Sequence, residues 1–249
     1  MQGDSGFGDI VAVVRDLRQR CDFDRALTLA TLRPYLREEL AEFEEAQDQG
    51  DEARVAAELG DILLHCAFQV VLAEERRAFS LADVSERLVA KMKARHPHLY
   101  AGGAKPDWER MKADERRKLA KETDEAASVL GHLPPGLPEL ERAFRLQERA
   151  AAVGFDWPDV DGPLGKLEEE VREARTHPAE EIGDVLFAAV NVARKAGVHP
   201  TLALKAASAK FVRRFQGIEK LAAARGVDVA SAGLETLDGM WNEVKDGEP

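Results

Sequence analysis

The sequence has few of the features that mark secreted, membrane-spanning or metal-stapled proteins. It has only two cysteines in 249 residues, too few for a disulfide framework and without the spacing of a zinc site. No apolar run reaches the roughly 18 residues of a membrane span, because His65 and Gln69 interrupt residues 62–73. The N-terminal residues lack the basic and apolar regions of a secretory signal. We therefore expect a cytoplasmic protein with reduced thiols and no membrane partner.

Basic residues are also in the minority. The chain has 35 Lys and Arg against 46 Asp and Glu, and its formal net charge is −11. Because phosphate backbones need a basic surface, nucleic acid is not an expected partner. Segments of alternating β-branched residues are scarce, whereas Ala, Leu, Glu, Arg and Lys dominate. These are strong helix formers, so the sequence predicts an all-α fold.

Apolar periodicity and helix-ending signals locate the first helices. Apolar residues recur at spacings of three and four over residues 36–46, which predicts an amphipathic helix that ends at Gly50. A second helix is expected over 52–72, so that the pair forms a hairpin. A third is expected over 81–95, with Ser80 as its N-cap and Pro97 as its stop.

The middle of the chain reads as a connection between two domains. Residues 101–106 and the proline-rich residues 131–138 predict loops, and no helix is expected to cross the latter. Residues 107–128 are highly charged and fit either a solvated helix or a linker. We therefore expect one domain over residues 1–105, a linker over 106–138 and a second domain over 139–249.

The second half of the sequence repeats the first. The segment EELAE at 38–42 returns as EEVRE at 169–173, an offset of 131 residues. The segment ELGDIL at 58–63 returns as EIGDVL at 181–186, an offset of 123 residues. The hairpin connection is therefore eight residues shorter in the second copy. Two tandem copies of one helical module explain this pattern better than chance.

Each copy carries four carboxylates on its hairpin. Residues three apart share a helix face, so the side chains of E-x-x-E and E-x-x-D project together. Four anions repel one another unless a cation neutralises them, and all-oxygen ligands select Mg²⁺, with Mn²⁺ as the alternative. Mg²⁺ recruits substrate phosphates, which favours nucleotide chemistry. The carboxylates are Glu170, Glu173, Glu181 and Asp184 in the second copy, and Glu39, Glu42, Glu58 and Asp61 in the first.

The alternative for each cluster alone is a solvated acidic helix face. A glycine precedes the aspartate in each copy, at Gly60 and Gly183. Glycine inside a helix costs roughly 1 kcal/mol relative to alanine, so we expect a packing or site reason for both. The repetition of the whole constellation favours the metal site.

Three cations lie on one predicted helix farther along. Lys210, Arg213 and Arg214 are spaced by three and four residues, and Arg forks match phosphate oxygens. They predict a phosphate clamp facing the metal. An ordinary amphipathic helix with Phe211 and Phe215 in the core and the cations outside is the alternative. Asn191 follows Asp184 within an apolar run, and its amide needs either a structural partner or a ligand.

Together these motifs resemble the MazG family of all-α nucleoside triphosphate pyrophosphohydrolases. Further matching segments are RPYL at 33–36, RHPH at 95–98, VGFDW at 153–157 and KFVRRF at 210–215, and the resemblance spans about residues 15–245. It implies two tandem MazG-like helical modules and a homodimer. It also implies Mg²⁺-dependent hydrolysis of nucleoside triphosphates to monophosphate and pyrophosphate, in cleaning of the nucleotide pool.

The resemblance also implies roles for individual residues. The four carboxylates of the second copy would bind Mg²⁺, and a water oriented by a carboxylate would be the nucleophile. Trp241 would pack on the base, with a plain core tryptophan as the equal alternative. The catalytic residues would be Glu170, Glu173, Lys210 and Arg213, and the substrate-binding residues Asn191, Lys210, Arg213, Arg214 and Trp241.

The two copies differ, and the chain departs from the family pattern. Asn191 aligns with Phe68, and Arg213 aligns with Ala94. We therefore expect most hydrolysis in the second module and a weaker, regulatory or structural site in the first. The family's C-P-W-D becomes CDFD at 21–24. Only seven residues separate Glu173 from Glu181, so the second hairpin must turn close to its carboxylates.

Two other classes of protein compete with this interpretation. A non-catalytic helical regulatory or interaction protein would keep the fold and bind a nucleotide or a partner without hydrolysis. A di-iron bundle needs Glu-x-x-His pairs. None of the six histidines follows a glutamate by three residues, so the di-iron interpretation is disfavoured.

Overall fold

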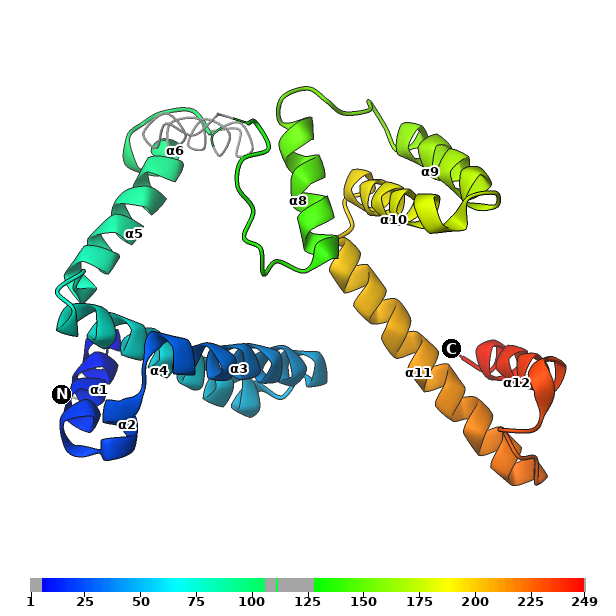
Figure 1. Ribbon diagram of the computed structural model, residues 1–249, viewed down its shortest axis with the longest axis horizontal. Helices are drawn as coiled ribbons and strands as arrows, with labels where there is room; N and C mark the ends of the chain where they lie inside the picture. The colour runs from blue at the N-terminus through cyan, green and yellow to red at the C-terminus, as the bar shows by residue number, and fades with distance from the viewer. Residues whose placement is uncertain (1–5, 106–110, 112–127, 249) are drawn as a thin grey trace. The chain divides into compact units, whose positions relative to one another are not determined.

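The computed structural model describes residues 6–105, 111 and 128–248, which form helices and connecting turns (Figure 1). No strand occurs among these residues, and this confirms the predicted all-α class. The chain divides into two compact units, a first unit of residues 1–105 and a second unit of residues 106–249. Most of the linker expected over 106–138 lies outside the described residues.

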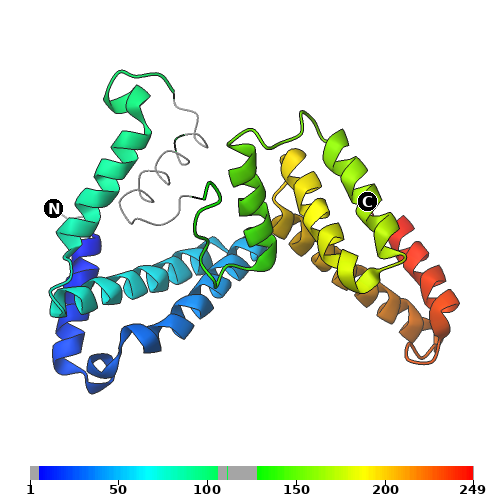
Figure 2. The same cartoon turned by 45° about the horizontal axis from the view of Figure 1, so that its top comes forward.

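The first unit is built around a helical hairpin. Its elements are α1 (Phe7–Arg20), α2 (Asp22–Ala26), α3 (Leu29–Gln49), α4 (Glu52–Glu75), α5 (Leu81–Arg95) and α6 (Pro97–Tyr100). Gly50 closes α3 with a left-handed φ of 68°, and the Asp51 side chain caps α4 by accepting a hydrogen bond from the Arg54 N–H. Both Figures 1 and 2 show α3 and α4 side by side, as the predicted hairpin requires.

Helix α4 supplies most of the core of this unit. By length and composition alone α4 could cross a membrane. The absence of a long uninterrupted apolar run in the sequence did not predict this. Here its apolar face is occupied by protein, and burial of each large aliphatic side chain stabilises the unit by about 1.5–3 kcal/mol. Its buried residues Ala67, Phe68, Val70, Val71 and Leu72 pack with Val11 and Val14 of α1 and Leu32 of α3.

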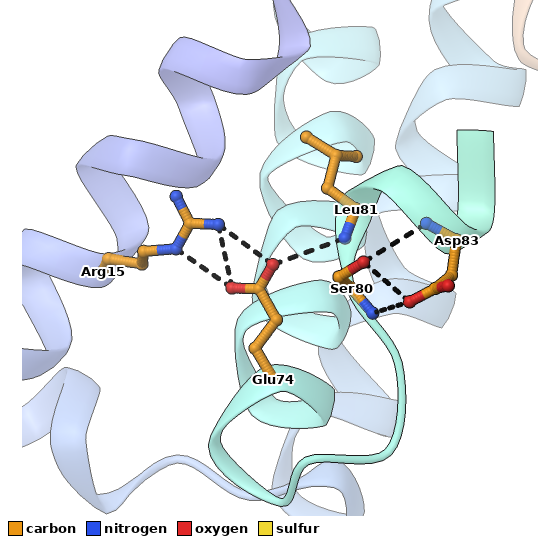
Figure 3. Close-up of polar contacts among 5 residues, drawn as sticks. All are labelled: Arg15, Glu74, Ser80, Leu81 and Asp83. Atoms are coloured by element: carbon orange, nitrogen blue, oxygen red, sulfur yellow. Dashed lines mark hydrogen bonds and ion pairs between the residues drawn. The ribbon is translucent and has the colours of Figure 1, made fainter. Parts of the chain in front are cut away.

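Glu74, near the end of α4, connects three helices of the first unit (Figure 3). Its carboxylate accepts hydrogen bonds from the Arg15 guanidinium at 2.8 Å and from the Leu81 backbone N–H at 3.3 Å. Beside it, Ser80 Oγ accepts from the Asp83 N–H, and the Asp83 carboxylate accepts from the Ser80 N–H. This capping box makes Ser80 the N-cap of α5, as predicted.

The second unit contains a second, tighter hairpin. Its elements are α8 (Glu139–Ala151), α9 (Asp161–Ala174), α10 (Pro178–Lys195), α11 (Pro200–Arg225) and α12 (Gly233–Asp246). Three residues connect α9 to α10, which confirms the early turn that the sequence predicted. Residues 131–138 contain no helix, also as predicted.

Two sets of contacts organise this unit. Helices α9 and α10 pack closely on each other, and α8 packs on α10 (Figure 2). Helix α12 folds back on α11, where Ile218, Ala222 and Met240 form a small buried cluster. The hairpin therefore positions the second group of carboxylates, while α11 and α12 position the predicted cations.

Candidate metal centre

The hairpin of the second unit brings the predicted carboxylates together. Glu170 and Glu173 lie on α9, and Glu181 and Asp184 lie on α10. One carboxylate oxygen from each of Glu170, Glu181 and Asp184 lies within 4.8 Å of the others. Glu173 forms an equally close group with Glu170 and Glu169. Glu170 belongs to both groups and therefore lies at the centre of the cluster. It is only 6% exposed.

The carboxylates of this cluster repel one another. Partial burial raises the pKa of Glu181, and the nearby charges of Glu173, Glu170 and Asp184 raise it further. A divalent cation would remove this repulsion, because it would place positive charge between the converging carboxylates. The donor set, all carboxylate oxygens from two rigid helices, fits Mg²⁺ or Mn²⁺ better than zinc.

Lys166 is a member of this site that the sequence analysis missed. It lies one turn before Glu170 on α9, and its Nζ is 2.6 Å from the Glu170 carboxylate and 2.8 Å from that of Glu169. Hydrogen bonds to these two carboxylates raise the pKa of Lys166, and the same contact lowers the pKa of Glu169. The spacing of four residues between Lys166 and Glu170 could have predicted this ion pair, because residues i and i+4 lie on the same face of a helix.

The first unit carries a similar cluster on α3 and α4. Carboxylate oxygens of Glu39, Glu58 and Asp61 lie within 4.8 Å of one another. Glu42 adjoins them, and the charge of Glu58 is the main reason that the pKa of Glu42 is raised. Burial, followed by the charge of Asp61, raises the pKa of Glu39. Both hairpins therefore gather carboxylates into a possible cation site.

Two cationic or titratable side chains touch the first cluster and were not predicted. Arg54 Nε lies 3.4 Å from the Glu58 carboxylate, and His65 Nε2 lies 3.8 Å from that of Glu39. Burial lowers the pKa of His65, which favours its neutral form. Tyr35 stacks on the same imidazole at 6.5 Å between ring centroids. The surroundings of the two clusters thus differ.

Both guanidiniums of the predicted phosphate clamp have a partner in α12's C-terminal extension. Arg213 and Arg214 lie on α11, and their Nη2 atoms are 3.1 Å and 2.7 Å from the carboxylate of Glu248. Lys210 is on the same helix and is exposed. The hydrogen bonds of these arginines within one chain go to Glu248 and not to the carboxylates of the hairpin.

Trp241 belongs to the packing between α11 and α12. Its ring centroid lies 5.4 Å from that of Phe211, and the Arg214 guanidinium lies over it at 5.5 Å. The ring also borders the small buried cluster around Ile218. These contacts support the core alternative that the sequence left open for Trp241.

Asn191 lies next to the second carboxylate cluster and is buried. Its Oδ1 accepts a hydrogen bond from Arg194 Nε at 2.9 Å. Arg194 also contacts Asp156, whose carboxylate is 2.5 Å from Nη2. A cavity of about 190 Å³ is lined by Asn191 together with Glu170 and Asp184. Asn191 therefore has a structural partner and also borders the cavity beside the carboxylates.

Close packing does not explain the two glycines inside helices, Gly60 and Gly183, although glycine there lowers helix stability. A Cβ built on either Gly60 or Gly183 meets no other side chain or distant backbone within 4 Å. Neither glycine is therefore required by contacts among the described residues of the chain. Both leave open space beside the aspartate that follows.

Comparison with known proteins identifies the family. The helical hairpins and their carboxylate clusters define an all-α protein with sites suited to divalent cations. Residues 27–100 match the family model of the MazG nucleotide pyrophosphohydrolase domain. A Thermotoga maritima protein named nucleoside triphosphate pyrophosphohydrolase/pyrophosphatase MazG is 38% identical over 97% of this chain and 96% of its own length. The Escherichia coli K12 nucleoside triphosphate pyrophosphohydrolase is 36% identical over 95% of this chain and 94% of its own.

The chain therefore belongs to the MazG family, as its motifs indicated. The similarity to both relatives extends over nearly the whole chain and so includes both units, whereas the family-model match lies in the first unit.

Proposed function

We propose that the chain hydrolyses nucleoside triphosphates to nucleoside monophosphates and pyrophosphate in the cytoplasm, in cleaning of the nucleotide pool. The observation that carries the proposal is the convergence of carboxylates from α9 and α10, which repel one another without a cation. The names of the full-length relatives support the same reaction. The products follow from adding water across the bond between the α- and β-phosphates.

The second unit is proposed as the main catalytic unit. Glu170, Glu173, Glu181 and Asp184 would hold Mg²⁺ or Mn²⁺, which would supply positive charge against the carboxylates and the triphosphate. Glu170 and Glu173 would orient a water molecule, and one of these two carboxylates would take up its proton as the water attacks the α-phosphorus. The bridging P–O bond then breaks, and pyrophosphate carries away the electron pair of that bond.

The cations on α11 are proposed to bind the phosphate oxygens. Arg213 and Arg214 offer planar forks that match phosphate, and Lys210 adds a point charge. Positive charge placed where pyrophosphate departs stabilises the transition state more than the bound substrate. In the single chain both arginines hold the Glu248 carboxylate, so a triphosphate would have to replace that carboxylate.

The first unit is proposed as a weaker or regulatory site. It keeps Glu39, Glu42, Glu58 and Asp61, but Phe68 occupies the position of Asn191. Each cluster has a basic neighbour, Arg54 beside Glu58 here and Lys166 beside Glu170 in the second unit, so the difference between the units rests on the position of Asn191. The model of the MazG domain matches residues 27–100 of this unit, and this match does not assign the unit a rate.

A homodimer is part of the same proposal. Ile182 and Leu186 lie one turn apart on α10 and are both more than half exposed. An exposed apolar stripe of this kind is typical of an interface, and Gly183 beside it leaves room for close approach. Sedimentation equilibrium should give twice the chain mass, and Leu186→Lys should give the monomer mass. A monomeric parent protein would contradict this part of the proposal.

Product analysis tests the reaction. Each of the standard ribo- and deoxyribonucleoside triphosphates is incubated with purified protein and Mg²⁺, and the products are separated. We expect monophosphate and pyrophosphate, with no turnover in EDTA or in a folded Glu173→Ala variant. Folded wild-type protein that cleaves no triphosphate would favour the alternative, a non-catalytic regulatory protein that binds a nucleotide or a partner.

A further inference from the structure

A second cavity adjoins the carboxylates of the second unit. Its volume is about 240 Å³, and its walls are almost entirely apolar. Trp157, Phe187 and Asn191 border both this cavity and the smaller one that contains Glu170 and Asp184. We call it the aromatic cavity. A ligand whose charged end lies at the carboxylates could therefore place an apolar end in the aromatic cavity.

One polar group in the aromatic cavity lacks a partner. Gln147 of α8 lines the cavity and is only 6% exposed. Its Nε2 donates a hydrogen bond to the Phe187 carbonyl at 2.8 Å, which fixes the orientation of the amide. Its Oε1 is buried and accepts no hydrogen bond from any described residue. A buried acceptor left without a donor is costly, so an N–H group from a ligand would be favourable here.

The aromatic wall is held in place by specific contacts. Phe155 and Trp157 lie in the loop between α8 and α9 and flank Asp156. The Asp156 carboxylate is 2.5 Å from Arg194 and 3.0 Å from Lys195, so the loop is tied to α10. The backbone that carries the two aromatic residues is therefore positioned before any ligand binds.

The apolar walls, the aromatic side chains and the unpaired acceptor of this cavity fit a nucleobase. A nucleobase is flat and apolar on its faces, where it stacks on aromatic side chains, and it carries N–H donors at its edge. The neighbouring carboxylates are at the end where a cation and phosphates would lie. Trp241 is less suited to the base, because Phe211 and Arg214 already contact its ring.

We infer that the aromatic cavity binds the nucleobase, with Gln147 Oε1 accepting a hydrogen bond from a base N–H and Phe155 and Trp157 stacking on the ring. The inference rests on the proposed function, since it deepens the same site. It makes Gln147 a base-binding residue. Adenine, guanine, cytosine and uracil all carry an N–H, so Gln147 would recognise a base as such while the shape of the cavity ranks the four.

Two substrate analogues isolate the two parts of the inference. Ribose 5-triphosphate has no base, and purine riboside triphosphate has a purine ring without an N–H donor at its pairing edge. We expect wild-type kcat/KM for ATP to exceed that for purine riboside triphosphate by at least about tenfold. In Gln147→Met this ratio should approach one, while kcat/KM for ribose 5-triphosphate stays within about twofold of wild type. The base-free substrate therefore reports whether the variant has merely disturbed the fold.

A second variant keeps the test decisive if Gln147→Met fails to fold. Phe155 is 80% exposed, so Phe155→Leu costs little stability but removes a stacking surface. It should raise KM for ATP several-fold and leave ribose 5-triphosphate unaffected. Leu234→Ala is the matched control, since this α12 side chain is 84% exposed and lies outside the residues lining the cavity. It should change neither substrate.

The possible failures are distinct. If wild-type protein cleaves none of the standard nucleoside triphosphates and no ribose 5-triphosphate, the proposed function fails. If it cleaves ATP, but Gln147→Met and Phe155→Leu change both substrates equally or change neither, the nucleobase site is overturned and the hydrolase remains.

Discussion

Glu248 accepts hydrogen bonds from both Arg213 and Arg214, so one carboxylate occupies two guanidiniums of the proposed phosphate clamp. The hydrogen bond from Arg214, reinforced by that from Arg213 against the opposing effect of burial, lowers the pKa of Glu248 to about 2. The carboxylate is therefore charged at any pH at which the enzyme would work. It resembles a phosphate group in charge and in the way it meets an arginine fork.

Removing this internal competitor should strengthen substrate binding. In Glu248→Gln the arginines lose a charged partner that a triphosphate must otherwise replace. We expect KM for nucleoside triphosphates to fall several-fold with little change in kcat, because the phosphates no longer compete with a carboxylate. Steady-state kinetics over a range of salt concentrations measures the effect.

Glu243→Gln is the matched control for that substitution. Glu243 lies on α12 and accepts hydrogen bonds from both Nη atoms of one α11 arginine, Arg225, at 3.0 Å and 2.6 Å. Arg225 is not among the proposed phosphate-binding residues, so KM should not change. An equal fall in KM in both variants would mean that loss of acidic charge alone is responsible. A rise in KM in Glu248→Gln would contradict the competition.

The two carboxylate clusters should differ in their contribution to catalysis. Glu173→Ala removes a proposed catalytic residue from the second unit and should reduce Mg²⁺-dependent turnover by at least about a hundredfold. Glu42→Ala makes the corresponding change in the first unit and should leave much of the activity, because Phe68 replaces the amide of Asn191 there. Rates are measured at saturating Mg²⁺, with circular dichroism as the folding control. Equal losses would show that both units contribute alike.

The parts of the fold that depend on local signals could be predicted from the sequence. Ser80 and Pro97 bracket α5, and the structure gives the helix the bounds those residues suggested. Gly50 ends α3 because only a left-handed residue fits that position easily. The spacing of three residues in E-x-x-E and E-x-x-D also predicted the convergence of Glu170, Glu181 and Asp184, since it fixes a helix face.

The contacts that depend on tertiary packing could not be predicted in this way. Gln147 reaches the site from α8. The hydrogen bond from its Nε2 to the Phe187 carbonyl, forty residues away, fixes the amide and leaves its Oε1 without a partner among the described residues. Glu248 meets Arg214 across thirty-four residues, through the fold of α12 on α11. No periodic pattern relates such positions. The open space beside Gly60 and Gly183 likewise depends on tertiary packing, which the sequence pattern does not predict.

Asp156 should make the second unit sensitive to acid. Burial alone would raise the pKa of Asp156, but hydrogen bonds from Arg194 and Lys195 outweigh it and hold the pKa below its usual value. A lowered folded-state pKa contributes stability that is present above the unfolded pKa of about 3.9 and is lost as pH falls through the folded pKa. We therefore expect Asp156→Asn to lower the free energy of unfolding by about 1–3 kcal/mol at pH 7.

The pH dependence separates this effect from a simple loss of packing. Urea unfolding at pH 7 and pH 3 should show that the difference between wild type and Asp156→Asn shrinks in acid. Asp22→Asn is the control, because its ion pair with Arg25 is exposed and should contribute less than about 1 kcal/mol at either pH. A difference for Asp156→Asn that is the same at both pH values would contradict the role of the charge.

Gly162 and Gly165, on the same helix, should respond oppositely to alanine. A Cβ on Gly162 would lie 2.1 Å from Cδ1 of Trp157, so the ring must move, whereas a Cβ on Gly165 meets nothing within 4 Å. We expect Gly162→Ala to lower the free energy of unfolding by about 1–3 kcal/mol and to raise KM for nucleotides, because Trp157 forms a wall of the aromatic cavity. Gly165→Ala should instead stabilise α9 by about 0.5–1 kcal/mol.

The double variant Gly162→Ala, Trp157→Leu identifies the cause of that loss. If the clash with the indole is responsible, Gly162→Ala should cost much less stability when Trp157 is already leucine, so the two changes are not additive. Additive losses in urea unfolding would instead place the cost of Gly162→Ala in the backbone at the start of α9. In that case Trp157 would be free to move, and the aromatic wall would be less rigidly positioned than the contacts of Asp156 and Gly162 imply.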